Sequence, residues 1–184
     1  MQYNNPWTTL EGHTMYENNW IRVREDKVLT PAGKPGIYGV VHFKSIAVAI
    51  IPLDDDNNTW IVGQFRYPTQ TYEWEVVEGG CPEGSSPEET AHRELLEECG
   101  IQAQIMKPIL EMQLSNSATD EVSVSYVARQ LSFTESEPEE TEKLVVKKIS
   151  FDELFEMTLR GEIKDGLSVA SIFKCKWMLD KGLI

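Results

Sequence analysis

The sequence predicts an α/β fold in which short strands surround one long helix and two more helices follow. Residues 45–53 form a nearly continuous apolar run, which is typical of a central strand buried on both faces. Residues 87–99 carry a helical pattern with clear start and end signals. Residues 151–160 and 168–180 have helical patterns near the C-terminus. Together these observations favour a mixed sheet covered by helices.

The remaining elements are expected from alternating hydrophobicity and turn chemistry. Residues 20–28 alternate, and residues 30–36 are rich in proline and glycine, so residues 1–43 are predicted to form short strands or hairpins. Residues 54–59 are expected to form a turn. Further strands are predicted at 37–43, 60–66, 73–77, 105–113, 122–130 and 144–149.

Composition indicates a globular domain and argues against nucleic acid as a partner. The 184 residues, 41% hydrophobic and 26% charged, suffice for one globular domain with a core. The net charge of −13 argues against a nucleic-acid-binding surface. An anionic substrate must therefore be met by local arginines and by metal. The acidic run at residues 135–142 is interpreted as an exposed loop.

Cysteine usage and hydropathy indicate a cytoplasmic protein. Cys81, Cys99 and Cys175 are an odd number at unrelated spacings, so neither a disulfide framework nor a zinc site is expected. The N-terminus lacks a basic region followed by an apolar run, and no apolar stretch approaches 18 residues. We therefore expect neither secretion nor a membrane partner.

Three carboxylates crowd the end of the predicted long helix. Glu94 neighbours both Glu97 and Glu98, and each like-charge pair costs about 0.2–0.5 kcal/mol. At about 100° per residue they border the apolar arc instead of lying opposite it. That arc is formed by Ala91, Leu95, Leu96 and Cys99. The start signals are Ser86 as N-cap, Pro87 at the first helical position and Glu89 in a capping box, and Gly100 marks the end.

The residue types indicate which ion Glu94, Glu97 and Glu98 are suited to bind. Clustered carboxylates without His or Cys are hard oxygen ligands, which suit Mg²⁺, or Mn²⁺, better than zinc. Magnesium in turn implies a phosphate-bearing substrate, because it binds through a few carboxylates plus substrate phosphates. The residues before the helix, 78–84, read as a glycine-rich loop that a ligand can approach closely.

Residues 79–101 resemble the Nudix box. The fixed positions of that pattern fall on Gly79, Arg93, Glu94, Leu95, Glu97, Glu98, Gly100 and Ile101. The one departure is Ser85, which stands where the family has the glutamate that usually pairs with the arginine. Glu83, Glu88 or Glu89 could replace that partner. The resemblance implies a Nudix-type α/β/α sandwich with a mixed central sheet and an N-terminal β-strand extension.

Residues outside the box narrow the resemblance to ADP-ribose pyrophosphatases and related nucleoside-diphosphate-sugar hydrolases. The stretches 64–68 and 74–80 are similar to that group, as are residues 160–168. The resemblance implies that Arg66 contacts the substrate diphosphate and that Glu75 belongs to the substrate site. The alternative for Arg66 is that it caps a surface acid, and Asp165 or Ser168 is expected to cap the last helix.

The same resemblance assigns roles in a magnesium-dependent hydrolysis of ADP-ribose or a related nucleotide sugar. Glu94 and Glu98, with Glu97 and the Glu78 carbonyl group, would hold the metal, and Arg93 supports them. The base is Glu121, in the polar loop 115–121, or Glu97; Glu121 as a further metal ligand is a third alternative.

The N-terminal strands have an expected role of their own. Trp20 and Tyr38 are candidates for stacking on the nucleobase, against the alternative that strand aromatics only pack in a core or interface. The resemblance implies a homodimer formed through residues 1–43, with the hydrolase domain at 44–184 and one structural unit overall. A nucleoside triphosphate pyrophosphohydrolase and a non-catalytic nucleotide-sugar-binding domain are the alternative functions.

Overall fold

The computed structural model describes residues 4–134 and 144–184, which form two compact units. One unit comprises the residues up to Ser45 together with Gln113–Glu121, and the other comprises Ile46–Met112 and the residues from Val122 onward. The acidic run predicted as a loop lies outside the described residues. The proposed domain boundary after residue 43 stays a prediction.

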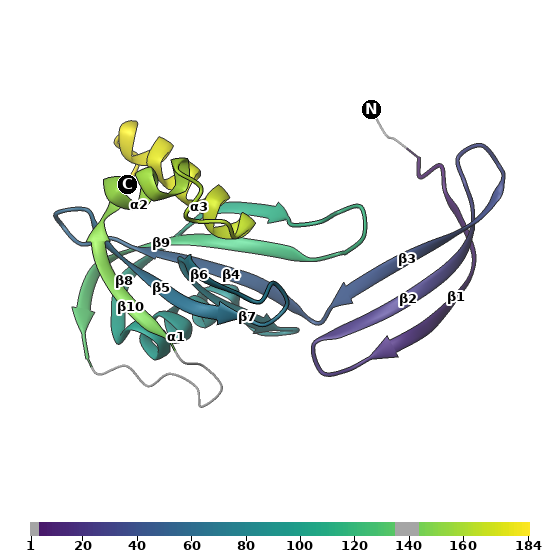
Figure 1. The fold of residues 1–184 in the computed structure, drawn as a ribbon, viewed down its shortest axis with the longest axis horizontal. Helices are drawn as coiled ribbons and strands as arrows, with labels where there is room; N and C mark the ends of the chain where they lie inside the picture. The colour runs from purple at the N-terminus through teal and green to yellow at the C-terminus, as the bar shows by residue number, and fades with distance from the viewer. Residues whose placement is uncertain (1–3, 135–143) are drawn as a thin grey trace. The chain divides into compact units, whose positions relative to one another are not determined.

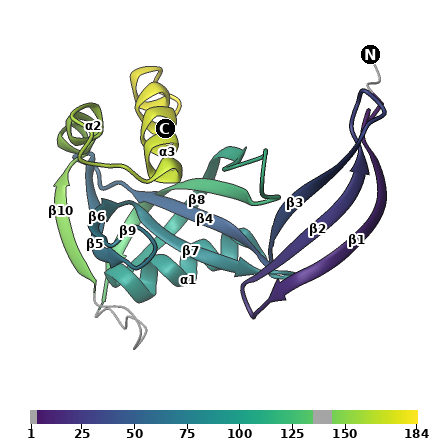
Figure 2. The ribbon, with the colours of Figure 1, turned by 45° about the vertical axis from the view of Figure 1, so that its right-hand side comes forward.

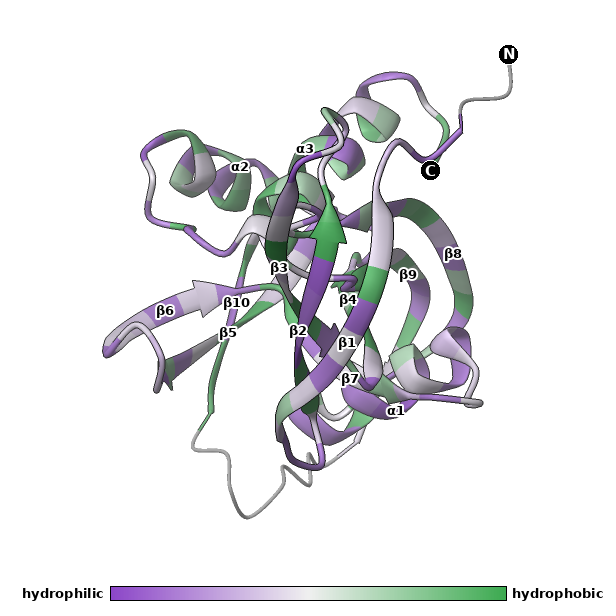
Figure 3. Ribbon diagram, turned by 90° about the vertical axis from the view of Figure 1, so that its right-hand side faces the viewer, coloured by the Kyte–Doolittle hydropathy of each residue, from purple (hydrophilic) through white to green (hydrophobic). Residues whose placement is uncertain are grey.

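The N-terminal unit contains an antiparallel sheet of three strands in the order β1-β2-β3. Its strands are β1 (Thr8–Glu17), β2 (Ile21–Leu29) and β3 (Pro35–Phe43). Every residue of β1 is exposed, and Figure 3 shows hydrophilic and hydrophobic colours alternating along β1 and β2. Large apolar side chains on these strands and their turn are among the most exposed: Leu10, Met15, Tyr16, Trp20 and Ile37.

The second unit has two sheets and all three helices. One sheet has the order β7-β4-β9-β8, and the other has the order β10-β5-β6. The bounds are β4 (Ser45–Pro52), β5 (Asn58–Arg66), β6 (Thr71–Glu75), β7 (Val77–Pro82), β8 (Ile101–Gln113), β9 (Val122–Phe133), β10 (Val145–Ser150), α1 (Pro87–Cys99), α2 (Phe151–Leu159) and α3 (Gly166–Asp180). Figures 1 and 2 show α1 on one side of these strands and α2 and α3 on the other, which is the predicted α/β/α layering.

The apolar run at residues 45–53 is the central strand that the sequence predicts. β4 lies between β7 and β9 and pairs with β9 in parallel, so the sheet is mixed. Val48, Ala49, Ile50 and Ile51 have no exposed surface. Because both faces of β4 are covered, its sequence does not alternate. Ala91 and Leu95 of α1 join Val48 and Ile50 in one core cluster.

The structure corrects the expected course of the chain before α1. Residues 78–84 were predicted as a glycine-rich loop, but strand β7 continues through Gly79 and Gly80 to Pro82. Cys81 is fully buried in the core cluster, so a core contact holds this stretch in the sheet. The predicted strand 73–77 is two strands, β6 and β7. Among the described residues, no helix is long and apolar enough to cross a membrane.

Candidate active site

Helix α1 begins and ends where the sequence predicts. The Ser86 hydroxyl accepts a hydrogen bond from the Glu89 backbone N–H at 3.4 Å, which satisfies one of the free donors of the first turn. Pro87 follows at the start of the helix. Gly100 adopts φ 65°, ψ 28°, and its N–H closes the last turn onto the Leu95 and Leu96 carbonyl groups. Both ends of the carboxylate-bearing helix are therefore fixed by local signals.

The three carboxylates near the end of α1 differ in burial. The Glu97 side chain is 31% exposed and the Glu94 side chain 13%, whereas Glu98 as a residue is only 3% exposed. The sequence placed Glu98 at the edge of the buried arc, and the structure turns it further inward. A buried carboxylate is costly unless a cation or hydrogen-bond donors compensate its charge. Glu98 is thus the strongest metal-ligand candidate of the three.

Arg93 is held by two of these carboxylates. Its Nη2 lies 2.7 Å from Glu94 Oε1, and its Nη1 lies 2.8 Å from Glu97 Oε2. Ser85 occupies the position where the Nudix pattern has a glutamate partner. Among the residues that the structure describes, Glu94 and Glu97 are the ion-pair partners of Arg93, in place of the suggested Glu83, Glu88 or Glu89. The arginine therefore neutralises part of the charge of the crowded turn.

Gly79 lies directly against the Glu94 side chain. A Cβ atom at position 79 would overlap with the Cγ, Cδ and Oε1 atoms of Glu94. The first glycine of the box is thus required by a close approach of β7 to α1, and not by a turn. This contact brings the Glu78–Gly79 backbone next to the carboxylates.

Arg66 and Glu75 form a tight pair at the end of β5 and β6. Arg66 Nε lies 3.0 Å from each Glu75 carboxylate oxygen, and Nη2 also donates to Oε2. The Glu75 side chain is 4% exposed, whereas that of Arg66 is 39% exposed. The hydrogen bond to Glu75 raises the pKa of the Arg66 guanidinium, so Arg66 stays charged. The pairing orients a half-exposed arginine, and the substrate contact predicted for Glu75 stays a prediction.

Glu78 connects Arg66 to helix α3. One Glu78 oxygen lies 3.7 Å from Arg66 Nη2, and the other accepts a hydrogen bond from the Ser168 hydroxyl at 2.7 Å. Burial and the nearby Asp165 carboxylate raise the pKa of Glu78 well above its ordinary value. A hollow of about 530 Å³, lined by Arg66 and Glu75 among others, opens beside this cluster.

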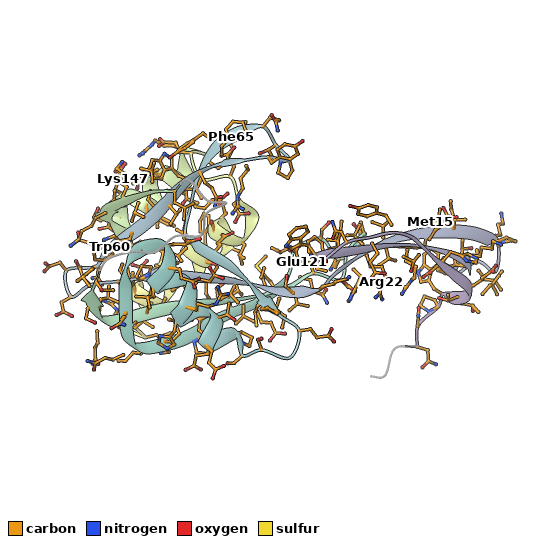
Figure 4. All side chains as sticks on the ribbon, turned by 90° about the horizontal axis from the view of Figure 1, so that it is seen from below. Met15, Arg22, Trp60, Phe65, Glu121 and Lys147 are labelled. Carbon is orange, nitrogen blue, oxygen red and sulfur yellow. The ribbon has the colours of Figure 1, made fainter. Side chains whose placement is uncertain are left out.

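The loop with Glu121 belongs to the N-terminal unit. Residues 115–121 run along β3: the Val41 N–H donates to the Ala118 carbonyl group at 2.9 Å, and Asp120 accepts from the Phe43 N–H at 3.0 Å. His42 Nδ1 lies 2.6 Å from the Asp120 carboxylate. These hydrogen bonds outweigh burial and hold the pKa of Asp120 below its ordinary value. Glu121, labelled in Figure 4, ends the loop.

The two aromatic candidates also lie in the N-terminal unit. Trp20 is 71% exposed beside the β1–β2 turn. Tyr38 is half-buried, donates its hydroxyl hydrogen to the Ser117 carbonyl group at 2.7 Å, and meets Trp7 edge to face at 5.3 Å. Tyr38 therefore packs within its own unit, whereas the Trp20 ring is accessible, and the stacking role of both residues stays a prediction.

Comparison with known protein families decides the identity of the fold. A family model described as NUDIX domain matches residues 44–168. The chain belongs to the Nudix family. A second model, described as nucleoside diphosphate sugar hydrolase N-terminal domain, matches residues 7–41. The predicted family and the predicted fold class are both confirmed.

Relatives of this Nudix chain share most of its length. An ADP-ribose pyrophosphatase of Mycobacterium tuberculosis is 30% identical over 169 residues, covering 89% of this chain and 80% of the relative. An ADP-ribose pyrophosphatase of Bacillus subtilis is 30% identical, covering 85% and 80%. A methanol dehydrogenase activator of Bacillus methanolicus is 26% identical, covering 89% of both. A solved structure, "Crystal structure of ADP compounds hydrolase", has the same fold with a TM-score of 0.86 and 21% identity, covering 100% of both chains.

The donor types of this Nudix site suit a hard divalent cation. Within residues 4–134 and 144–184, no group of three or more His, Cys, Asp or Glu side chains already converges as a metal centre. Arg93 holds Glu94 and Glu97 at this point of the structure. Carboxylate and carbonyl oxygens are nevertheless the ligands that Mg²⁺ and Mn²⁺ prefer. A side chain would not fit at Gly79, because the Glu94 carboxylate lies directly against the backbone there.

The contact between Ser168 and Glu78 has no local signal in the sequence. The Asp165 carboxylate accepts from the Ser168 N–H at 2.7 Å, so Asp165 caps α3 as expected. The Ser168 hydroxyl, however, bonds Glu78, which lies 90 positions earlier. Only the packing of α3 on the sheet brings these two residues together.

Proposed function

We propose that this Nudix hydrolase cleaves the diphosphate linkage of ADP-ribose or a related nucleoside-diphosphate sugar with Mg²⁺ as cofactor, Mn²⁺ being able to replace it. The products are a nucleoside monophosphate and a sugar phosphate, which for ADP-ribose are AMP and ribose 5-phosphate. The observation that carries the proposal is the position of Arg66. Glu75 orients its guanidinium group, and Glu78 lies beside it. The residue after Glu78 is Gly79, against which Glu94 packs. The N-terminal nucleoside-diphosphate-sugar hydrolase match and the two ADP-ribose pyrophosphatase relatives support the substrate class.

Different residues of the chain are assigned to the metal and to the diphosphate. Glu94 and Glu98, with Glu97 and the Glu78 carbonyl group, would hold the metal. The chemistry that it would supply is neutralisation of the diphosphate charge and activation of the attacking water. Arg66 donates hydrogen bonds to the diphosphate, for which its planar fork of donors is suited. Arg93 offsets the repulsion between the carboxylates by pairing with both Glu94 and Glu97.

We assign the base role to Glu121. Glu97 is the alternative, but its carboxylate already accepts from Arg93 at 2.8 Å. The assignment of Glu121 comes from its place in the polar loop that follows the box. Loops positioned by a rigid scaffold commonly carry such residues, and the hydrogen bonds of residues 115–121 to β3 provide one.

The N-terminal strands are proposed to form a homodimer interface and to contact the nucleobase. Exposed apolar side chains on β1, on its turn and on β3 support an interface, because a small sheet that leaves several large apolar side chains exposed commonly buries them against a partner. Trp20 is the better placed of the two stacking candidates, since Tyr38 is engaged within its own unit. The three free cysteines support the cytoplasm as the location.

A substrate panel tests the proposed reaction. With Mg²⁺ present, we expect ADP-ribose or another nucleotide sugar to give a nucleoside monophosphate and a sugar phosphate, and we expect EDTA to abolish turnover. Products are identified by ion-exchange chromatography for nucleotide sugars, dinucleotides and nucleoside triphosphates. Preferred release of pyrophosphate from a triphosphate would replace this proposal with a pyrophosphohydrolase. Binding without turnover of any compound would favour a non-catalytic domain.

The base assignment makes a separate prediction. Replacing Glu121 with Gln is expected to lower kcat by about 10²- to 10⁴-fold, the range for loss of a general base, with little change in metal affinity. Glu97→Gln should cost less. Glu111→Gln, an exposed change on β8, serves as the control. A larger loss of kcat for Glu97→Gln than for Glu121→Gln, with metal affinity unchanged, would move the base role to Glu97. A fall in metal affinity for Glu121→Gln would make Glu121 a metal ligand.

A further inference from the structure

Ser168 is a fully buried residue at the start of α3, where its backbone N–H makes one hydrogen bond and its hydroxyl makes two. Its N–H donates to the Asp165 carboxylate at 2.7 Å, as part of the helix cap. Its hydroxyl oxygen accepts from the Val76 N–H at 3.1 Å. Because a hydroxyl has one hydrogen to donate, that hydrogen goes to Glu78 Oε1 at 2.7 Å. Ser168 has 0% exposure, so no solvent can replace these contacts.

The partners of the Ser168 hydroxyl lie in residues 75–79, the stretch that joins the parts of the site. Glu75 orients Arg66 through both of its oxygens. Glu78 lies 3.7 Å from Arg66 Nη2. Gly79 packs against Glu94 of α1. A shift of residues 75–79 therefore changes the position of Arg66 and of the Glu78–Gly79 backbone together.

We propose, building on the proposed hydrolysis, that Ser168 is a positioning residue of the reaction. By holding the Val76 N–H and the Glu78 carboxylate, it keeps residues 75–79 in the position that would present Arg66 to the diphosphate and the Glu78 carbonyl group to the metal. The Glu78 side chain is 14% exposed, so its alternative hydrogen-bond donors are few. Loss of this hydrogen bond would leave a largely buried Glu78 oxygen unsatisfied, which is costly, and would leave Glu78 able to turn toward Arg66.

Ser171 provides a matched control on the same helix. It also has 0% exposure, and its hydroxyl also makes two short contacts, to the Leu167 carbonyl group at 2.7 Å and to the Ser125 hydroxyl at 2.7 Å. These contacts join α3 to itself and to β9, and none reaches residues 75–79. If Ser168 only packs α3 against the sheet, replacing either serine with alanine should have the same effect on turnover and on metal affinity.

The experiment compares Ser168→Ala with Ser171→Ala in the full chain. Three quantities are measured: kcat and KM for ADP-ribose with Mg²⁺, the affinity for Mn²⁺ alone by electron paramagnetic resonance, and the midpoint of thermal unfolding. We expect Ser168→Ala to lower kcat/KM and Mn²⁺ affinity by about ten- to a hundredfold, as is usual for residues that orient metal ligands. Ser171→Ala should leave both within about threefold while unfolding at a similar temperature.

A double mutant tests whether Ser168 acts through Glu78. If it does, the effects of Ser168→Ala and Glu78→Ala on kcat/KM are strongly non-additive, whereas those of Ser171→Ala and Glu78→Ala add. Ser168→Cys, which keeps the size and a weak donor, should give an intermediate loss and is measured in the same way if the alanine variant does not fold.

The outcomes separate this proposal from the proposed function. Equal behaviour of Ser168→Ala and Ser171→Ala in turnover and Mn²⁺ affinity would overturn the role of Ser168 and leave the hydrolysis standing. A wild-type enzyme that hydrolyses no nucleotide sugar would overturn the proposed substrate class. In that case the Mn²⁺ measurement still decides the role of Ser168, because it uses no substrate.

Discussion

Replacing Glu98 with Gln is expected to lower kcat/KM for ADP-ribose by about 10²- to 10⁴-fold. A metal ion held by Glu98 would supply several kcal/mol of transition-state stabilisation, and each 1.36 kcal/mol corresponds to a tenfold change in rate. Glu98 is the most buried carboxylate of α1, with 3% of its surface exposed, so no mobile neighbour can take its place easily. The amide has nearly the same shape but lacks the negative charge that attracts the ion. The measurement is steady-state kinetics at saturating Mg²⁺.

A control on the same helix separates loss of the ligand from loss of charge. Glu88 is exposed in the first turn of α1, so Glu88→Gln removes the same charge far from the crowded turn. We expect its kcat/KM to stay within about threefold of wild type, because exposed charges interact weakly. Near-wild-type turnover of Glu98→Gln at saturating Mg²⁺ would show that Glu98 is not a metal ligand.

Replacing Arg66 with Lys is expected to lower kcat/KM by about a hundredfold although the positive charge is kept. Arg66 uses Nε and Nη2 for Glu75, which aims the rest of its guanidinium group. Lysine has no planar fork, so it cannot bind Glu75 and a phosphate oxygen in fixed directions at once. Loss of hydrogen bonds to a charged group at about 1.5–3 kcal/mol corresponds to roughly ten- to a hundredfold.

Arg129→Lys is the matched control for this change. Arg129 also uses its guanidinium group for two partners, the Asp54 carbonyl group and the Asn57 side chain, each at 2.8 Å. These partners lie in the β4–β5 turn and touch none of the proposed site residues. We expect a change in thermal stability with little change in turnover. If Arg66→Lys affects turnover no more than Arg129→Lys, Arg66 has only a structural role.

Sequence reasoning went furthest where local chemistry decides the structure. Ser86, Pro87 and Gly100 set the ends of α1, because caps satisfy backbone groups of their own turn. The lack of alternation in residues 45–53 predicted the buried strand β4, since burial on both faces removes the need for polar residues. The prediction of a glycine-rich loop was wrong for residues 78–82, where strand β7 continues through two glycines. The packing of Cys81 in the core outweighs the low strand propensity of glycine there.

The sequence by itself determined the family, the carboxylates of α1 and the positions where that helix begins and ends. These features depend on residue types at fixed short spacings, which a helix translates directly into neighbours. Only the tertiary structure decided that Glu98 is buried, that Arg93 pairs with Glu94 and Glu97, that Glu75 orients Arg66, and that Ser168 holds Glu78. Most of these features depend on how strands and helices far apart in the chain pack together, and that packing has no signature in any short stretch of residues.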